Sequence, residues 1–260
     1  MKKVVMIALA AVVIAGGGVA LKGGKWDGRS RFTVISIGDT VKVESIDPAI
    51  SGGVRLTLPG NLELETVGGR GKWRAEVLAK LAQKYGKKWA ADSAANYLGI
   101  GYTAENGGLG IRERWSWWRW RREEEWREVD MVRERLVREV AEVDGQKVLV
   151  VSENWEPVAQ KWFVSGVIAN ENLSVEIENA SGVDGAGNNV ARMMETAGIK
   201  VDKVESGAVI TGKCVIEAPT SEVKKTGVIW LKRQLGCIWR GGEQFKVTLA
   251  KDYGEWWKGD

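Results

Sequence analysis

The segment 173–206 constrains the fold of this chain more than any other stretch of its sequence. Leu173, Val175 and Ile177 alternate with polar residues, a pattern typical of a half-buried strand. A glycine-rich turn follows over 179–187, and apolar residues then recur at helical spacing until Gly198. The alternating pattern resumes after Gly198. The segment therefore predicts a strand, a turn, a helix and a second strand in one compact unit.

Three further elements are expected downstream of this unit. The sequence predicts a strand over 209–216, a helix over 220–235 and a last strand over 245–249. The order from residue 173 is then β-α-β-β-α-β, which is the ferredoxin-like order. We expect a small domain over 173–254, joined to the first half by a linker over 152–172.

The first half reads as a mixed α/β domain over 32–151, after a glycine- and charge-rich linker over 22–31. Strands are expected over 32–37, 40–46, 54–58 and 148–151, and helices over 73–85 and 92–98. The strongest predicted helix covers 121–143, where valines and Leu136 recur at spacings of three and four before Gly145. The fold class is therefore α/β (α+β).

The N-terminus predicts the location of the protein. Lys2 and Lys3 precede 18 uncharged, mostly apolar or glycine residues over 4–21. This pattern predicts a single-pass transmembrane signal anchor over 1–21 in the plasma membrane, with the N-terminus inside and both domains extracytoplasmic. Two alternatives stay open: a cleavable signal peptide with its site at Gly18-Val19-Ala20, and a buried N-terminal helix of a soluble protein.

Composition excludes several classes of function. The chain has no histidine, which excludes Ser-His-Asp and Cys-His catalysis and histidine-ligated zinc. Of its 38 basic residues, 36 remain once Lys2 and Lys3 are set aside, against 34 acidic ones. The bulk charge thus gives no sign of a nucleic-acid partner, and two cysteines alone cannot build a zinc site.

Several short motifs resemble one family of cell-envelope proteins. The turn Asn179-Ala180-Ser181-Gly182-x-x-Gly185 resembles the opening of the C-terminal domain of LytR–CpsA–Psr (LCP) proteins. Three motifs between residues 32 and 100 resemble the LCP core: Val-Glu-Ser-Ile-Asp-Pro at 43–48, Leu-Thr-Leu-Pro at 56–59 and Tyr-Leu-Gly-Ile at 97–100. The resemblance implies a membrane-anchored chain that handles cell-wall glycopolymers.

The departures from the family concern its chemistry. LCP enzymes move a glycopolymer from a polyprenyl pyrophosphate lipid to the wall, using arginines around the phosphates and carboxylates around a divalent cation. The Pro-Arg-Asp position of the family reads Pro59-Gly60-Asn61 here. An active transferase, which would need Mg²⁺, would have to use the remaining candidates Asp39, Arg70, Arg74 and Arg112.

We therefore expect a protein with no catalytic site and no cofactor or metal, which binds or scaffolds at the boundary between membrane and cell wall. Its expected partners are the membrane, anionic lipid or a wall glycopolymer, and no nucleic acid. An active LCP-type phosphotransferase with Mg²⁺ and a membrane-tethered adaptor for a partner protein are the alternatives.

The glycine-rich turn is one candidate binding site, because free N–H groups at a helix N-terminus attract anions. Its residues are Asn179, Ser181, Gly182, Gly185 and Gly187. A structural alternative is that these glycines serve positive φ angles and close packing of helix on strand.

The segment 112–122 is a second candidate, with five arginines and four tryptophans in eleven residues. This mixture suits contact with a membrane surface or an anionic polymer. The contact residues would be Arg114, Trp115, Trp117, Trp118, Arg119, Trp120 and Arg121. The alternative is a loop entering a charged helix, with Arg119–Glu123 and Arg121–Glu125 pairs and one or two tryptophans in the core.

The two cysteines are the last feature. Outside the cytoplasm two cysteines usually pair, and the LCP resemblance points to a cysteine on each of the same two elements. We therefore expect a Cys214–Cys237 disulfide, with free buried thiols as the alternative.

Overall fold

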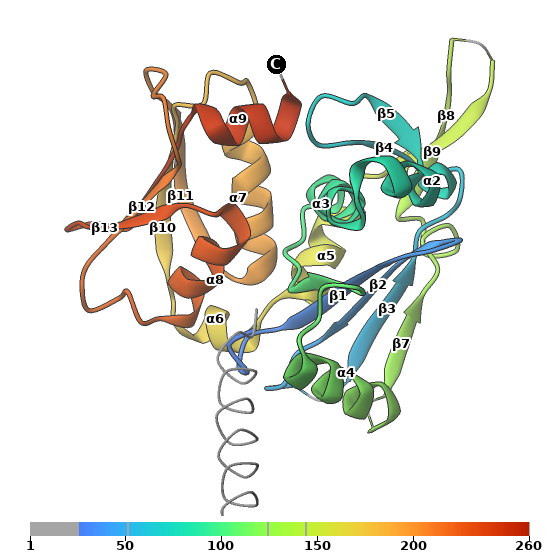
Figure 1. The fold of residues 1–260 in the computed structure, drawn as a ribbon, viewed down its shortest axis with the longest axis horizontal. Coiled ribbons are helices and arrows are strands. Elements are labelled where there is room, and N and C mark those ends of the chain that lie inside the picture. Colours follow the sequence, from blue (N-terminus) through green and yellow to red (C-terminus); the bar gives the residue numbers. More distant parts are fainter. Residues whose placement is uncertain (1–25, 51, 124, 144, 260) are drawn as a thin grey trace, which may run out of the picture.

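The structure is a computed structural model that describes residues 26–50, 52–123, 125–143 and 145–259. It contains two five-stranded sheets, each with its own helices. Figure 1 shows the layers: α7 and α8 lie between the second sheet and the first half of the chain, where α3 and α5 face them. The predicted anchor over 1–21 lies outside the described residues. Within the described part of the chain, none of the helices combines the length and the apolar character that crossing a membrane requires.

The first sheet has the strand order β6-β1-β2-β3-β7. Its strands are β1 (Phe32–Ile37), β2 (Val41–Ile46), β3 (Gly53–Thr57), β6 (Ala104–Glu105) and β7 (Trp126–Val129). The central three are antiparallel, and each edge strand runs parallel to its neighbour. Ile35, Val43 and Leu56 stand opposite one another in this register and are fully buried on one face. The predicted strands 32–37, 40–46 and 54–58 are thus confirmed, with ends shifted by one residue at most.

Helices cover both faces of the first sheet. On one face lie α2 (Ala75–Tyr85), α3 (Lys87–Leu98) and α5 (Trp155–Phe163). The other face carries α4 (Ile111–Glu123), whose Trp117 and Trp120 pack against Phe32 in a separate aromatic cluster. The predicted helix 73–85 begins at Ala75 because residues 72–74 form β5 (Lys72–Arg74), which pairs with β4 (Glu63–Glu65). The predicted helix 92–98 begins earlier, at Lys87.

The prediction of a long helix over 121–143 is wrong. Helix α4 ends at Glu123, β7 follows, and residues 137–151 form a hairpin of β8 (Val137–Ala141) and β9 (Lys147–Val151). The Asp130 carboxylate accepts the N–H groups of Val132 and Arg133 and closes the turn between β7 and β8. Valine is stiff at χ1 and favours strands, and pairing of β7 with β3 overrides the helical spacing.

The second sheet confirms the strand–turn–helix–strand unit over 173–206 as β10 (Ser174–Asn179), α7 (Ala186–Ala197) and β11 (Lys200–Ser206). The prediction of a ferredoxin-like arrangement is wrong, because the strand order of the second sheet is β11-β10-β14-β12-β13. Strands β10 and β11 are direct parallel neighbours, so no strand is inserted between them. The remaining elements are β12 (Val215–Ala218), α8 (Thr226–Leu235), β13 (Ile238–Gly241), β14 (Lys246–Leu249) and α9 (Lys251–Lys258). Strand β13 and helix α9 are additions to the expected order.

The segment 152–172, expected to be a linker, folds into α5 and α6 (Gly166–Asn170). Trp155 is 1% exposed in the first core, and its indole N–H donates to the Leu98 carbonyl at 2.7 Å. Ile168 is fully buried in the second core. Large apolar side chains therefore tie this segment to both halves of the chain.

Candidate functional site

The four candidate transferase residues contact different parts of the protein. Asp39 is exposed in the turn between β1 and β2, and Arg112 is exposed on α4. The Arg70 guanidinium lies 4.0 Å over the Tyr85 ring, whereas Arg74 reaches Gln146 and Glu142 on the β8–β9 hairpin. Within the described residues no hydrogen bond or ion pair joins any two of the four candidates.

The glycine-rich turn uses its polar groups internally. The Asn179 amide donates to the Val183 carbonyl at 2.9 Å and accepts the Ser181 hydroxyl at 2.6 Å. Gly182 and Gly185 have φ of 80° and 82°, and a Cβ on Gly187 would lie 2.6 Å from a methyl group of Val204. These contacts favour the structural interpretation: conformation and close packing require the glycines.

The tryptophans of α4 divide between the core and the surface. Trp117 and Trp120 are buried, while Trp115 and Trp118 are 60% and 53% exposed. Of the expected ion pairs, Arg121–Glu125 is wrong, because the chain leaves the helix before Glu125. Arg121 instead lies 3.0 Å from Glu44, a carboxylate that also pairs with Arg55 at 2.9 Å.

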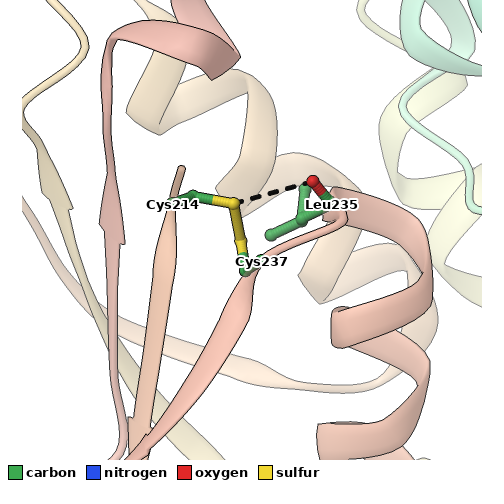
Figure 2. Close-up of a disulfide and its surroundings, with 3 residues drawn as sticks. All are labelled: Cys214, Leu235 and Cys237. Carbon is green, nitrogen blue, oxygen red and sulfur yellow. Dashed lines mark hydrogen bonds between the residues drawn. A yellow bond between two sulfur atoms is a disulfide. The ribbon is translucent and has the colours of Figure 1, made fainter. Parts of the chain in front are cut away.

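The Cys214–Cys237 disulfide is confirmed. The two Cα atoms are 4.6 Å apart, and both residues are buried in the second core. The Cys214 sulfur lies 3.6 Å from the Leu235 carbonyl oxygen (Figure 2); a disulfide sulfur has no proton to donate, so this is a packing contact. The bond joins the start of β12 to the chain just beyond α8.

The end of α8 fits closely against the first half of the chain. A Cβ on Gly101 would lie 2.1 Å from the Trp230 ring, so only glycine allows this approach. The Gln234 amide accepts the Tyr102 N–H at 3.2 Å and donates to the Tyr102 carbonyl at 2.8 Å. The backbone N–H and carbonyl groups of Tyr102 are thus both hydrogen-bonded to one side chain from the second half of the chain.

Two adjoining cavities follow this junction, with volumes of about 300 and 380 Å³. They share four lining residues: Lys88, Asp92, Arg233 and Gln234. The first also exposes Trp26, Tyr102, Glu105 and Trp230, and the second Lys213, Asp252, Tyr253 and Trp256. We call the combined depression, defined by these twelve residues, the junction groove.

A hydrogen-bonded carboxylate lies at the centre of the junction groove. Asp92 is 9% exposed and accepts the Tyr102 hydroxyl and the Lys88 ammonium, both at 2.6 Å. Burial, and then the Asp92 charge, raises the pKa of Tyr102 above its usual range, so this phenol stays protonated. Arg233 and Lys213 on the rim have no hydrogen-bond or ion-pair partner among the described residues.

The chemistry of the groove suits a polar ligand with apolar faces. Indole rings offer flat surfaces, Asp92 has free lone pairs, and the two rim cations can meet phosphate or carboxylate groups. No sequence motif indicates this site, because its residues come from three separate parts of the chain, at position 26, over 88–105 and over 213–256. Among the described residues, no cluster of three or more acidic or cysteine side chains could hold a metal ion.

Comparison with known proteins leaves the family open. No protein-family model matches this chain, and no curated protein matches it. Among solved structures, Bacillus subtilis TagU is 18% identical over 27% of this chain and 31% of its own, with a TM-score of 0.23. B. subtilis TagT is 10% identical over 81% and 93%, with a TM-score of 0.26. TagT, described as a LytR-CPS2A-psr family protein, also appears with bound octaprenyl pyrophosphate lipid at 12% identity, 80% and 92% coverage and a TM-score of 0.26. Similarity at this level does not assign the chain to the family and carries no argument about its activity.

Proposed function

We propose that this chain is an extracytoplasmic cell-envelope protein whose junction groove binds an anionic glycan without transferring it. The observation that carries the proposal is the groove itself, where partly accessible aromatic rings lie beside a hydrogen-bonded carboxylate and two cations that have no ion-pair partner among the described residues. Residues 4–21 would hold the protein at the membrane, as the sequence predicts.

The disulfide supports a location outside the cytoplasm. Disulfides persist in oxidising compartments and are rare in the cytosol, where thiols are kept reduced. Both cysteines of the chain are used in one buried bond, so neither is kept as a reactive thiol.

The lining of the groove supports a glycan ligand. Sugar rings present C–H faces that pack on indole, and Trp26, Trp230 and Trp256 supply such surfaces along the two cavities. Sugar hydroxyls can donate to the Asp92 carboxylate, which keeps lone pairs beyond its two hydrogen bonds. Phosphate or carboxylate groups on the glycan would pair with Arg233 and Lys213.

Binding without transfer fits the charges better than catalysis does. Phosphoryl transfer needs several cations and carboxylates around one reacting centre. Asp92 is already engaged by Tyr102 and Lys88, and the candidate transferase residues Asp39, Arg70 and Arg74 lie outside the groove lining.

Binding to isolated cell walls tests this proposal. The whole chain, purified in mild detergent, is titrated against walls before and after phosphate-linked polymers are removed. We expect binding that depends on the polymers and is weakened roughly tenfold or more by Arg233→Gln with Lys213→Gln, since a hydrogen bond to a charged group contributes about 1.5–3 kcal/mol. Lys224→Gln is the matched control, because Lys224 is exposed outside the groove lining.

Unchanged binding by the double variant would contradict the groove as the site, and equal binding to stripped walls would contradict an anionic ligand. Release of the polyprenyl lipid as its monophosphate from a pyrophosphate-linked polymer in the presence of Mg²⁺ would replace the binding role with the transferase alternative.

A further inference from the structure

On the outer face of α4, every exposed side chain is either a large apolar one or an arginine. Ile111, Trp115 and Trp118 are 76%, 60% and 53% exposed. The exposed residues of positions 111–122 are Ile111, Arg112, Arg114, Trp115, Trp118, Arg119, Arg121 and Arg122. None of them is acidic, so this face is strongly positive as well as apolar. We call these eight residues the α4 face.

The pattern around the helix is that of an interfacial helix. At about 100° per residue, Ile111, Trp115, Trp118 and Arg122 fall on one stripe. The other four arginines flank this stripe on both sides, and the buried Trp117 and Trp120 lie opposite. One side of the helix therefore packs in the protein core, and the other side exposes indole rings flanked by guanidinium groups.

Packing does not account for the outward tryptophans. Trp117 and Trp120 already fill the aromatic cluster against Phe32, while Arg119 and Arg122 extend over Trp115 and Trp118 at 5.4 and 4.2 Å. Indole beside guanidinium suits the headgroup layer of a bilayer, where the ring is half buried and the cation meets phosphate.

The acidic residue of this helix segment is turned away from the α4 face. Glu113 is 2% exposed, and its carboxylate accepts the Trp26 N–H at 2.8 Å and the Gly110 N–H at 2.7 Å. Burial of Glu113 leaves no carboxylate at positions 111–122 to repel an anionic surface.

Helix α4 also lies where the chain enters the folded body. Trp26, the first described residue, packs edge-on against Trp120 with ring centroids 5.1 Å apart and is hydrogen-bonded to Glu113. The apolar run 4–21 precedes Trp26 by only a few residues in the sequence. A body held by that run would therefore present α4 close to the membrane surface.

We propose that the α4 face lies on the bilayer, with Trp115 and Trp118 at headgroup depth and Arg112, Arg114 and Arg122 on the phosphates of anionic phospholipids. This contact would fix the orientation of the folded body on the membrane. The inference rests on the membrane location in the proposed function, but not on glycan binding in the junction groove.

A single thiol label on the whole chain tests the contact. Both native cysteines form the disulfide, so Ile111→Cys introduces one free thiol on the α4 face. Val143→Cys is the matched control, since Val143 is fully exposed on the β8–β9 hairpin, at the end of the first half away from α4 (Figure 1). Each labelled protein is reconstituted into phosphatidylcholine vesicles with or without phosphatidylglycerol, and quenching by lipid-attached nitroxide is measured after flotation.

We expect strong quenching at position 111, none above background at position 143, and a larger effect with phosphatidylglycerol. Adding Trp115→Ala and Trp118→Ala should reduce quenching at 111 to the level of the control, and both side chains are exposed enough to be removed without unfolding the chain. Protein that floats with equal quenching at both positions overturns this inference alone. Protein that does not float overturns the membrane location as well. Quenching at 111 that wall polymer abolishes would assign the α4 face to the polymer instead.

Discussion

Removing the Cys214–Cys237 bond should lower the free energy of unfolding by about 3 kcal/mol. The bond joins residues 23 positions apart, and the chain-entropy expression for a loop of this length gives about 3.4 kcal/mol at 25 °C. The loop contains α8, which supplies Leu231 to the second core and Gln234 to the junction groove. Loss of the bond therefore frees an element that packs in the second core and lines the junction groove.

Two perturbations separate the bond from the packing of its sulfur atoms. Reductant removes the bond alone, whereas Cys214→Ala with Cys237→Ala also removes two buried sulfur atoms and should cost roughly another 1–2 kcal/mol. Urea unfolding followed by circular dichroism gives both values. The double variant itself should be insensitive to reductant. A loss below about 1 kcal/mol in both experiments would refute the loop-entropy reasoning.

Three further predictions concern single features of the fold. Gly101→Val should destabilise the chain by about 2–3 kcal/mol because its Cβ collides with Trp230, whereas Gly107→Ala, in open space, should be nearly neutral; thermal melting compares the two. Glu44→Gln should cost about 1–2 kcal/mol in urea unfolding, since it leaves the half-exposed Arg121 without a carboxylate and Arg55 with Glu128 alone; a loss under about 0.5 kcal/mol would contradict the pairing. Burial raises the pKa of three of the four tyrosines, while the neighbouring Lys84 lowers that of the fourth, so phenolate absorbance should show one tyrosine ionising in the native protein. In the unfolded chain the other three tyrosines lose their phenolic protons above about pH 10, so the free energy of unfolding falls as pH rises beyond that value. Ionisation of all four tyrosines in the native protein would contradict this prediction. The three tyrosines with raised pKa are Tyr97, Tyr102 and Tyr253.

Local patterns predicted the elements whose boundaries are marked in the sequence. The unit over 173–206 was predictable because alternation changes to helical spacing between glycines, and Gly185 and Gly198 take positive φ at the two ends of α7. The disulfide was predictable because the expected location outside the cytoplasm and the LCP resemblance both favour pairing of the two cysteines.

The segment 121–143 shows where local patterns are insufficient. Its valines fit a helical stripe, but Val132 and Val143 are exposed in the structure, and the stripe has no continuous partner surface. What decides the structure is pairing of β7 with β3, some seventy positions earlier in the chain, which no local window contains.

The junction groove was unpredictable for the same reason. Gln234 and Tyr102 meet across 132 positions, and each looks like an ordinary surface residue in its own segment. That some of the α4 tryptophans are exposed, by contrast, could be predicted from the sequence, because four tryptophans exceed what one side of a short helix can bury. Which two point outward depends on how α4 lies on the sheet.

Hydrogen–deuterium exchange of the whole chain, with and without purified phosphate-bearing wall polymer, tests glycan binding in the groove most directly. Polymer bound in the groove should slow exchange in α8 and in residues 99–105, with no change in the β8–β9 hairpin. Polymer that binds but protects only the hairpin or α4, or slows exchange nowhere, would contradict it.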